Sequence, residues 1–202
     1  MPDPDATAAL TTTTTAADAP RPLPDGWRWA RLGDVCETQS GGTPVRGHSE
    51  YYGGNIAWAK IEDLTQSGMY IESTAERITI NGLENSSARL LPPGTVLLAM
   101  YGSIGTASIT RCSMTTNQAI IGCKCSEELL PEILWYWLAR TKGTLVAQGR
   151  GGTQSNLNAE IVRNILIPLP PLAEQRRIAT ILAARMAALR ELGARPAKAT
   201  SF

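Results

Sequence analysis

The fold is most constrained by a segment near the C-terminus, residues 173–192, that contains neither glycine nor proline. Pro168-Leu169-Pro170-Pro171 stands just before it and stops any strand, and the segment itself is rich in Ala, Leu, Arg and Met, which favour helices. A helix of this length is about 30 Å long, too long to be covered completely by one small domain. We therefore predict a long C-terminal helix, ended by Gly193 and Pro196, that lies partly against another helix.

Six residues of this segment follow alternating steps of three and four, which is the seam of a short coiled coil. They are Gln175, Ile178, Leu182, Arg185, Leu189 and Leu192. Ile181 widens the stripe that they form. The spacing favours a helical partner, and the alternative is a helix that folds back onto its own core.

The middle of the chain is typical of short strands separated by turns. The expected strands are residues 56–61, 95–101, 106–110 and 118–123, and the second and third are expected to pair as a hairpin across Gly102 to Gly105. Helical patterns follow at 131–141 and 158–164, and a last short strand at 165–168. The predicted class is α+β: a small, mainly antiparallel β core with flanking helices, followed by the long coiled-coil-type helix.

The length of 202 residues fits one domain with appendages. Residues 1–24 are mostly Thr, Ala, Pro and Asp and are predicted to be a disordered leader, because they contain almost nothing large enough to pack. Residues 25–171 form the predicted domain, 172–193 the helix and 194–202 a polar tail.

The net charge of +1 hides an uneven distribution. Residues 1–135 hold 9 Lys and Arg against 15 Asp and Glu, a charge of −6, whereas residues 136–202 hold 10 against 3, a charge of +7. The basic part is where a phosphate contact is first sought.

Several classes of enzyme are disfavoured by what the chain lacks. With one histidine, His48, it cannot build a His-based metal cluster or most Ser-His-Asp and Cys-His sites. Cys36, Cys112, Cys123 and Cys125 offer one C-x-C pair and no zinc-ribbon spacing, and they fit the reduced thiols of a cytoplasmic protein. No apolar stretch reaches the length of a membrane span, so we expect no membrane partner.

One acidic pair could in principle hold a magnesium ion. Glu62 and Asp63 are adjacent, and adjacent residues on a strand point to opposite faces, so a solvated turn is the favoured interpretation. No metal, no cofactor and no catalytic residue are assigned to the chain.

Three loops are rich in glycine and short polar side chains: residues 40–48, 101–105 and 149–156. Such loops are suited to bind a polyanion whose bases can be recognised by hydrogen bonds to their edges. None has the spacing of a nucleotide-binding P-loop. A purely structural role for each loop is the alternative.

A succession of short motifs then resembles one family. They are Gly26-Trp27, Leu32-Gly33-Asp34-Val35, Ser40-Gly41-Gly42-Thr43-Pro44, Tyr101-Gly102-Ser103-Ile104-Gly105, Asn117-Gln118-Ala119 and Pro168-Leu169-Pro170-Pro171-Leu172-x-Glu174-Gln175. In this order and spacing the chain, from about residue 23 to 192, resembles a target recognition domain of the DNA specificity subunits of type I restriction-modification systems.

The resemblance implies a non-catalytic subunit that binds one half of a split site on double-stranded DNA. A modification subunit would supply S-adenosylmethionine and methylate adenine, and a restriction subunit would supply ATP- and magnesium-dependent cleavage. Such subunits usually carry two recognition domains and two helices, and this chain holds one of each. It is therefore expected to be a half-subunit that forms a homodimer or pairs with a second specificity chain. The alternative is a truncated or silenced cassette that only binds the modification subunit.

Within this interpretation, the loops supply candidates for two roles. The candidates for base readout are Thr43, Arg46, His48, Tyr101, Ser103, Gln154 and Asn156, and the candidates for phosphate contacts are Lys60, Lys142 and Arg150.

Overall fold

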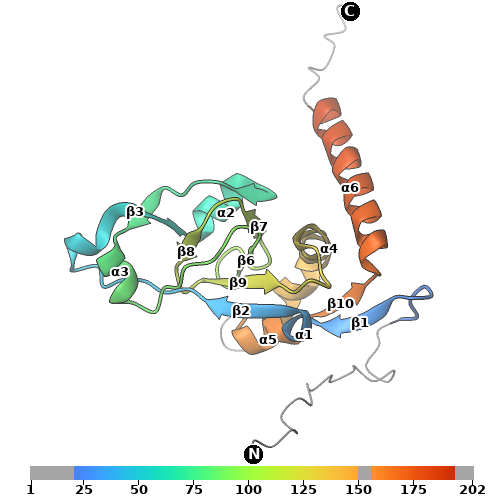
Figure 1. The fold of residues 1–202 in the computed structure, drawn as a ribbon, viewed down its shortest axis with the longest axis horizontal. Helices are drawn as coiled ribbons and strands as arrows, with labels where there is room; N and C mark the ends of the chain where they lie inside the picture. The colour runs from blue at the N-terminus through green and yellow to red at the C-terminus, as the bar shows by residue number, and fades with distance from the viewer. Residues whose placement is uncertain (1–20, 150–155, 194–202) are drawn as a thin grey trace, which may run out of the picture.

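The computed structural model describes residues 21–149 and 156–193, and these form three β-sheets with helices around them (Figure 1). The helices are α1 Leu32–Val35, α2 Ile61–Ser67, α3 Ile80–Glu84, α4 Pro131–Gly149, α5 Ala159–Arg163 and α6 Leu172–Gly193. The predicted α+β class is confirmed. Residues 1–20 of the predicted leader and residues 194–202 of the predicted tail lie outside the described residues.

The central sheet has five strands in the order β2-β9-β6-β7-β4. They are β2 Cys36–Ser40, β4 Tyr70–Ile71, β6 Val96–Ala99, β7 Ala107–Thr110 and β9 Ile120–Cys125. All neighbours are antiparallel except β4 and β7. The predicted hairpin is confirmed, since β6 pairs antiparallel with β7 and Val96 lies opposite Ile109.

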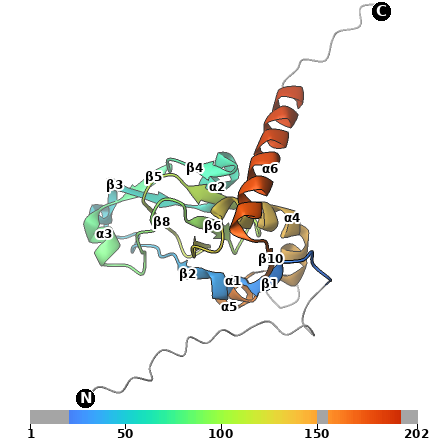
Figure 2. The same cartoon turned by 45° about the vertical axis from the view of Figure 1, so that its right-hand side comes forward.

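Two smaller sheets flank the central one. The first has the order β5-β3-β8 and consists of β3 Tyr52–Ala59, β5 Glu76–Ile78 and β8 Met114–Thr116. The second pairs β1 Arg28–Arg31 with β10 Leu166–Leu169, at the base of α6. In both ribbon views β3 and α3 lie at the end of the molecule opposite α6 (Figures 1 and 2).

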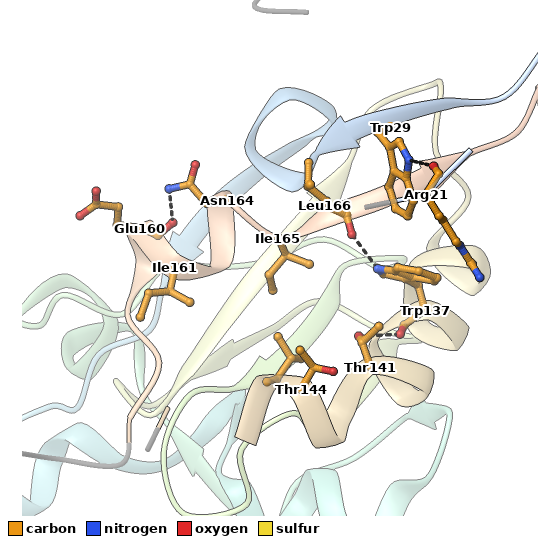
Figure 3. A pocket seen from close by; sticks show the side chains of 11 residues that line it. Arg21, Trp29, Trp137, Thr141, Thr144, Glu160, Ile161, Asn164, Ile165 and Leu166 are labelled. Atoms are coloured by element: carbon orange, nitrogen blue, oxygen red, sulfur yellow. Dashed lines mark hydrogen bonds between the residues drawn. The ribbon is translucent and has the colours of Figure 1, made fainter. Parts of the chain in front are cut away.

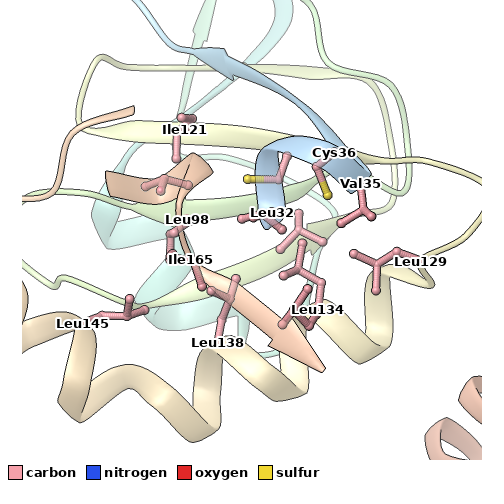
Figure 4. Packing of buried hydrophobic residues seen from close by; sticks show 14 of the residues in the cluster. Leu32, Val35, Cys36, Leu98, Ile121, Leu129, Leu134, Leu138, Leu145 and Ile165 are labelled. Carbon is pink, nitrogen blue, oxygen red and sulfur yellow. The ribbon is translucent and has the colours of Figure 1, made fainter. Parts of the chain in front are cut away.

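The central sheet is buried on both faces, as the side chains of β6 show. Val96 and Leu98 pack in the larger apolar cluster with α1, α4 and α5, and Figure 4 shows part of this cluster around Leu98. Leu97 and Ala99 pack in a second cluster with α2. A strand alternates its side chains between faces, so a run of buried apolar residues requires cover on both sides. Helices α1, α4 and α5 cover one face, and α2 together with strands β3 and β8 covers the other.

Four helices differ from the sequence prediction: α1, α2 and α3 were not predicted, and α4 is longer than predicted. Helix α4 continues to Gly149 beyond the predicted end at 141, because Leu145 carries its apolar face into the main cluster past Gly143. Helix α2 was not predicted, and it occupies residues assigned to the end of a strand and to a solvated turn. The prediction for Asp63 was wrong: this residue is buried and its carboxylate accepts hydrogen bonds from the backbone N–H groups of Lys60 and Ala75 at 2.8 and 2.9 Å.

The end of the predicted leader also differs from expectation. The indole N–H of Trp29 donates to the carbonyl of Arg21 at 3.0 Å, and the backbone N–H of Trp27 donates to the carbonyl of Pro24. Residues 21–24 are thus attached to the domain, since a half-buried indole N–H needs an acceptor.

Helix α6 leaves the domain from β10 and projects away from it (Figures 1 and 2). Its first turns are held by Gln175, whose side chain is fully buried. The amide oxygen of Gln175 accepts from the N–H of Leu130, and its NH₂ group donates to the carbonyls of Glu128 and Pro170. Gln175 therefore binds its own domain and does not belong to a free seam, because an unsatisfied buried amide would be costly.

We expect Gly41→Ala to destabilise the fold strongly. A Cβ at position 41 would lie 2.2 Å from both the carbonyl oxygen of Asn117 and the hydroxyl of Thr116. We expect a loss of about 2 kcal/mol or more in the free energy of unfolding, measured by urea denaturation. Gly47→Ala is the matched control, because a Cβ there meets nothing within 4 Å. Equal stability of the two variants would contradict the packing described here.

Candidate nucleic-acid interface

The loop after β2, residues 41–48, is fixed to the body of the protein at its start. The carbonyl of Gly42 accepts the indole N–H of Trp58 at 3.0 Å, and a Cβ at Gly42 would lie 2.3 Å from the backbone nitrogen of Ala88. Gly41 and Gly42 therefore allow close approach of the chain to itself, not to a phosphate. The second half of the loop is exposed and carries the candidates Arg46 and His48.

Arg46 has a defined position in this loop. Its guanidinium carbon lies 4.9 Å from the centre of the Tyr52 ring and 5.2 Å from that of Trp58. Its Nη1 also forms an ion pair with Glu76 of β5 at 3.0 Å. Stacking on aromatic rings and a carboxylate contact together orient a planar guanidinium.

Lys60, expected as a phosphate contact, pairs with the same carboxylate. Its ammonium donates to Oε1 of Glu76, while Arg46 occupies Oε2. The Lys60 ammonium, helped by the Arg46 guanidinium, holds the pKa of the Glu76 carboxyl below its usual value, because both cations favour the ionised form. The positive charge of Lys60 is thus partly neutralised within the protein.

The other two candidates of this loop also have partners within the chain. The ring of His48 stacks on Tyr51 at 4.8 Å between centroids, and its Nδ1 lies 2.8 Å from a carboxylate oxygen of Glu50. The hydroxyl of Thr43 donates to the side-chain oxygen of Gln118. The loop is therefore an ordered polar surface with His48 and Arg46 exposed on it.

The second candidate loop, residues 101–105, lies next to this surface. Gly102 and Gly105 have φ of +62° and +79°, which favours glycine at both positions. A Cβ on Gly102 would lie 3.4 Å from Ile61, the neighbour of Lys60, and a Cβ on Gly105 would lie 3.0 Å from Lys142. The loop thus joins the α2 end of the surface to α4.

Lys142 is the exposed cation on the α4 side of this loop. Its ammonium donates to the hydroxyl of Thr106 at 2.9 Å and, among the described residues, to no carboxylate. Its charge is therefore not neutralised as that of Lys60 is. Tyr101 packs partly against the main core and Ser103 is half-buried.

The structure thus gathers most of the candidates into two adjoining groups, which we call the candidate interface. The first group is Thr43, Arg46, His48 and Lys60, and the second is Tyr101, Ser103, Lys142 and Asn156. Asn156 joins the second because the N–H of the next residue, Leu157, donates to the carbonyl of Met100 at 2.9 Å. Arg150 and Gln154 lie outside the described residues.

Sequence reasoning missed the residues that hold these candidates in place. Tyr52, Trp58 and Glu76 belong to β3 and β5, and Trp58 lies directly opposite Glu76 in the sheet. No sequence pattern indicates that Trp58 and Glu76 are neighbours, because they are 18 positions apart and meet only through the pairing of β3 with β5.

A pocket of about 610 Å³ lies elsewhere, between α4, α5 and β10 (Figure 3). Trp137 forms part of its wall and donates its indole N–H to the carbonyl of Leu166 at 2.9 Å, and Trp29 packs edge-on against Trp137 with ring centroids 6.0 Å apart. None of the described candidates lines this pocket.

The free part of α6 carries an apolar stripe. Ile181, Met186 and Leu189 are 44%, 37% and 63% exposed, whereas Ile178 packs against the main core. Of the other predicted seam residues, Leu182 is half-buried, Arg185 is exposed and Leu192 lies in the last turn of the helix. The stripe begins where contact with the domain ends.

Two searches of residues 21–149 and 156–193 bear on other functions. No group of three or more His, Cys, Asp and Glu side chains in these ranges is placed to hold a metal ion. No helix in them is long and apolar enough to span a membrane.

Comparison with known proteins identifies the family. The model of the type I restriction modification DNA specificity domain matches residues 24–194. The chain belongs to this family. The MjaIX specificity subunit of Methanocaldococcus jannaschii is 31% identical over 163 residues, which are 79% of this chain and 38% of that protein. The HindI specificity subunit of Haemophilus influenzae is 27% identical over 151 residues, 73% of this chain and 33% of that protein.

Solved structures agree with this assignment. The HsdS subunit of Thermoanaerobacter tengcongensis superposes with a TM-score of 0.67 at 25% identity, over 88% of this chain and 42% of that one. A chain from a study of complex assembly and conformational transition of the type I R-M system gives a TM-score of 0.70 at 25% identity, covering 87% and 42%. The specificity domain of this chain thus spans about two fifths of the length of such structures.

Asp63→Ala should destabilise the first group of the interface. The variant leaves the backbone N–H groups of Lys60 and Ala75 without their acceptor. Lys60 forms an ion pair with Glu76, and Ala75 is the residue before Glu76. We expect a loss of about 1–3 kcal/mol in the free energy of unfolding by urea titration. Glu62→Ala changes the exposed adjacent carboxylate and serves as the control; a similar loss in both variants would refute the role given to Asp63.

Proposed function

We propose that this chain is the DNA-reading component of a type I restriction-modification assembly and has no catalytic activity of its own. Residues 25–171 form the recognition domain, and residues 172–193 form the helix that contacts partner subunits. The observation that supports DNA binding most directly is the candidate interface, which carries the exposed side chains of Arg46, His48 and Lys142 and whose two groups are linked by the approach of Gly102 to Ile61. Family membership supports the same role.

The proposed roles within the interface follow from charge. Arg46 and His48, both oriented and exposed, are suited to contact base edges, and Thr43, Tyr101, Ser103, Gln154 and Asn156 complete the set proposed for base readout. Lys142, whose charge is not neutralised, is suited to a phosphate, and Lys60 and Arg150 are the other proposed phosphate contacts.

In the proposed assembly, a modification subunit methylates adenine with S-adenosylmethionine, and a restriction subunit uses ATP and magnesium. One recognition domain reads one half of a bipartite site on double-stranded DNA. The free apolar stripe of α6 is the proposed contact for a second copy of this chain, for a second specificity chain or for the modification subunit.

The second candidate function is a protein-interaction module that binds the modification subunit through α6 and no longer engages DNA. The exposed stripe of α6 favours it, since the helix projects away from the domain that carries the candidate interface (Figure 1). The two functions differ in their response to salt, because affinity for DNA falls linearly with log salt concentration.

The decisive experiment is co-purification of the chain with the modification subunit encoded beside it, followed by mapping of methylated adenines in host DNA. A defined methylated motif supports the proposed function, and methylation without any motif contradicts it. A symmetric motif indicates two copies of this chain, and an asymmetric motif indicates a second specificity chain.

Lys142→Ala should weaken binding to cognate and scrambled duplexes by the same factor. Loss of one phosphate contact should also reduce the slope of log affinity against log salt by about 1. The measurement is fluorescence anisotropy of the complex with both duplexes at several salt concentrations. Lys124→Ala is the control, because that exposed lysine on β9 already pairs with Glu37. A change confined to the cognate duplex would refute the phosphate role.

Leu189→Lys should impair assembly without unfolding the chain. Leu189 is 63% exposed on the free part of α6, so a charge there costs no stability but disrupts an apolar helix contact. We expect affinity for the partner subunit to fall at least about tenfold, by isothermal titration. Leu90→Lys, which alters a 54% exposed leucine on the domain, is the control. Unchanged assembly of the Leu189 variant would exclude the stripe as a contact.

A further inference from the structure

Two cations of the candidate interface share one carboxylate. Glu76 accepts from Arg46 at Oε2 and from Lys60 at Oε1, and its side chain is 34% exposed. The pair of cations therefore presents one net positive charge and not two. A carboxylate on a surface that faces DNA repels phosphate, so its presence there indicates a role other than binding the DNA backbone.

The position of Glu76 is fixed by its strand. Glu76 lies opposite Trp58 in the pairing of β5 with β3, and its carbonyl accepts the hydroxyl of Thr74, whose oxygen in turn accepts the N–H of Trp58. The preceding residue, Ala75, is held by buried Asp63. The carboxylate is thus mounted on a rigid part of the domain.

Arg46 is held on a second side by aromatic rings that are themselves held. Tyr52 donates its hydroxyl to the carbonyl of Pro44, Trp58 donates to that of Gly42, and both acceptors belong to the loop that carries Arg46. Despite these contacts the side chain of Arg46 remains 59% exposed. One edge of the guanidinium is used by Glu76, and its remaining donors bind no other described residue and can meet a ligand.

We propose that Glu76 is a positioning residue that makes Arg46 a reader of guanine and prevents Arg46 and Lys60 from acting as a general phosphate clamp. Two mobile cations bind any DNA, because phosphate carries no sequence information. An oriented guanidinium with part of its charge neutralised gains most from a bidentate contact to O6 and N7 of guanine. Glu76 thus lowers the affinity of this surface for DNA of any sequence and increases its preference for the cognate sequence. This inference rests on the proposed DNA-binding function.

The test uses the complex with the modification subunit and two duplexes, the mapped motif and a scrambled one. With Glu76→Gln, which keeps the shape and removes the charge, we expect tighter binding of the scrambled duplex. We also expect a salt slope steeper by about 1 and a cognate-to-scrambled ratio reduced about fivefold or more. Glu72→Gln is the matched control for charge, because that exposed carboxylate forms no ion pair with a described residue.

A second variant shows whether Glu76 acts through Arg46. Arg46→Lys keeps the charge but not the planar fork, so it should lower the cognate-to-scrambled ratio without changing the salt slope. Adding Glu76→Gln to this variant should lower the ratio no further. Replacing single guanines of the motif with 7-deazaguanine, which lacks the N7 acceptor, should weaken wild type at one position and leave Arg46→Lys unaffected there.

The outcomes separate the two proposals. If the wild-type complex prefers no duplex, the proposed function fails. If wild type discriminates but Glu76→Gln behaves like Glu72→Gln, or weakens both duplexes equally with loss of folding stability, Glu76 is only a structural ion pair and the inference is overturned.

Discussion

The contact between Trp58 and Gly42 supports the first group of the candidate interface. The indole of Trp58 is 1% exposed, and its N–H donates to the carbonyl of Gly42 within a buried environment. A buried indole N–H requires an acceptor, so the hydrogen bond fixes the start of the loop that carries Arg46 to strand β3. The same ring then supports the guanidinium of Arg46, and the strand position opposite Trp58 supplies Glu76. One residue thus places the loop, the cation and the carboxylate.

Gln175 has the corresponding role at the other end of the molecule. Three hydrogen bonds join its buried amide to the backbone before α4 and before α6. They set the direction in which α6 leaves the domain, and Trp27 adds a bond from its indole to Glu174 at 2.9 Å. A helix that is rigidly mounted holds its free stripe at a fixed place relative to the interface. In the proposed assembly, which reads two half-sites, a rigidly mounted helix would fix the distance between the two recognition domains and hence the spacing of the half-sites on DNA.

The sequence predicted the features that depend on local pattern. The α+β class, the hairpin of β6 and β7 and the helix from Leu172 to Gly193 follow from period, turn residues and the absence of glycine and proline. Gln175 was misplaced because heptad spacing says nothing about which residue turns toward the domain. Helix α2 was missed because apolar residues 56–61 continued the strand pattern across Lys60, and buried Asp63, which supports its first turn, looks like an ordinary polar residue in sequence.

The candidate interface was predicted as a set of loops but not as an arrangement, and the difference is electrostatic. From sequence, Lys60 and Lys142 are expected to have the same role, a phosphate contact. In the structure Glu76 faces Lys60 and a hydroxyl faces Lys142, so a free charge remains only on the second of these two. The charge division along the chain indicated the same preference, because Lys142 belongs to the basic part and Lys60 to the acidic part. In the proposed function, oriented and internally paired Arg46 of the acidic part is suited to reading a base, and Lys142 of the basic part is suited to holding the backbone of DNA.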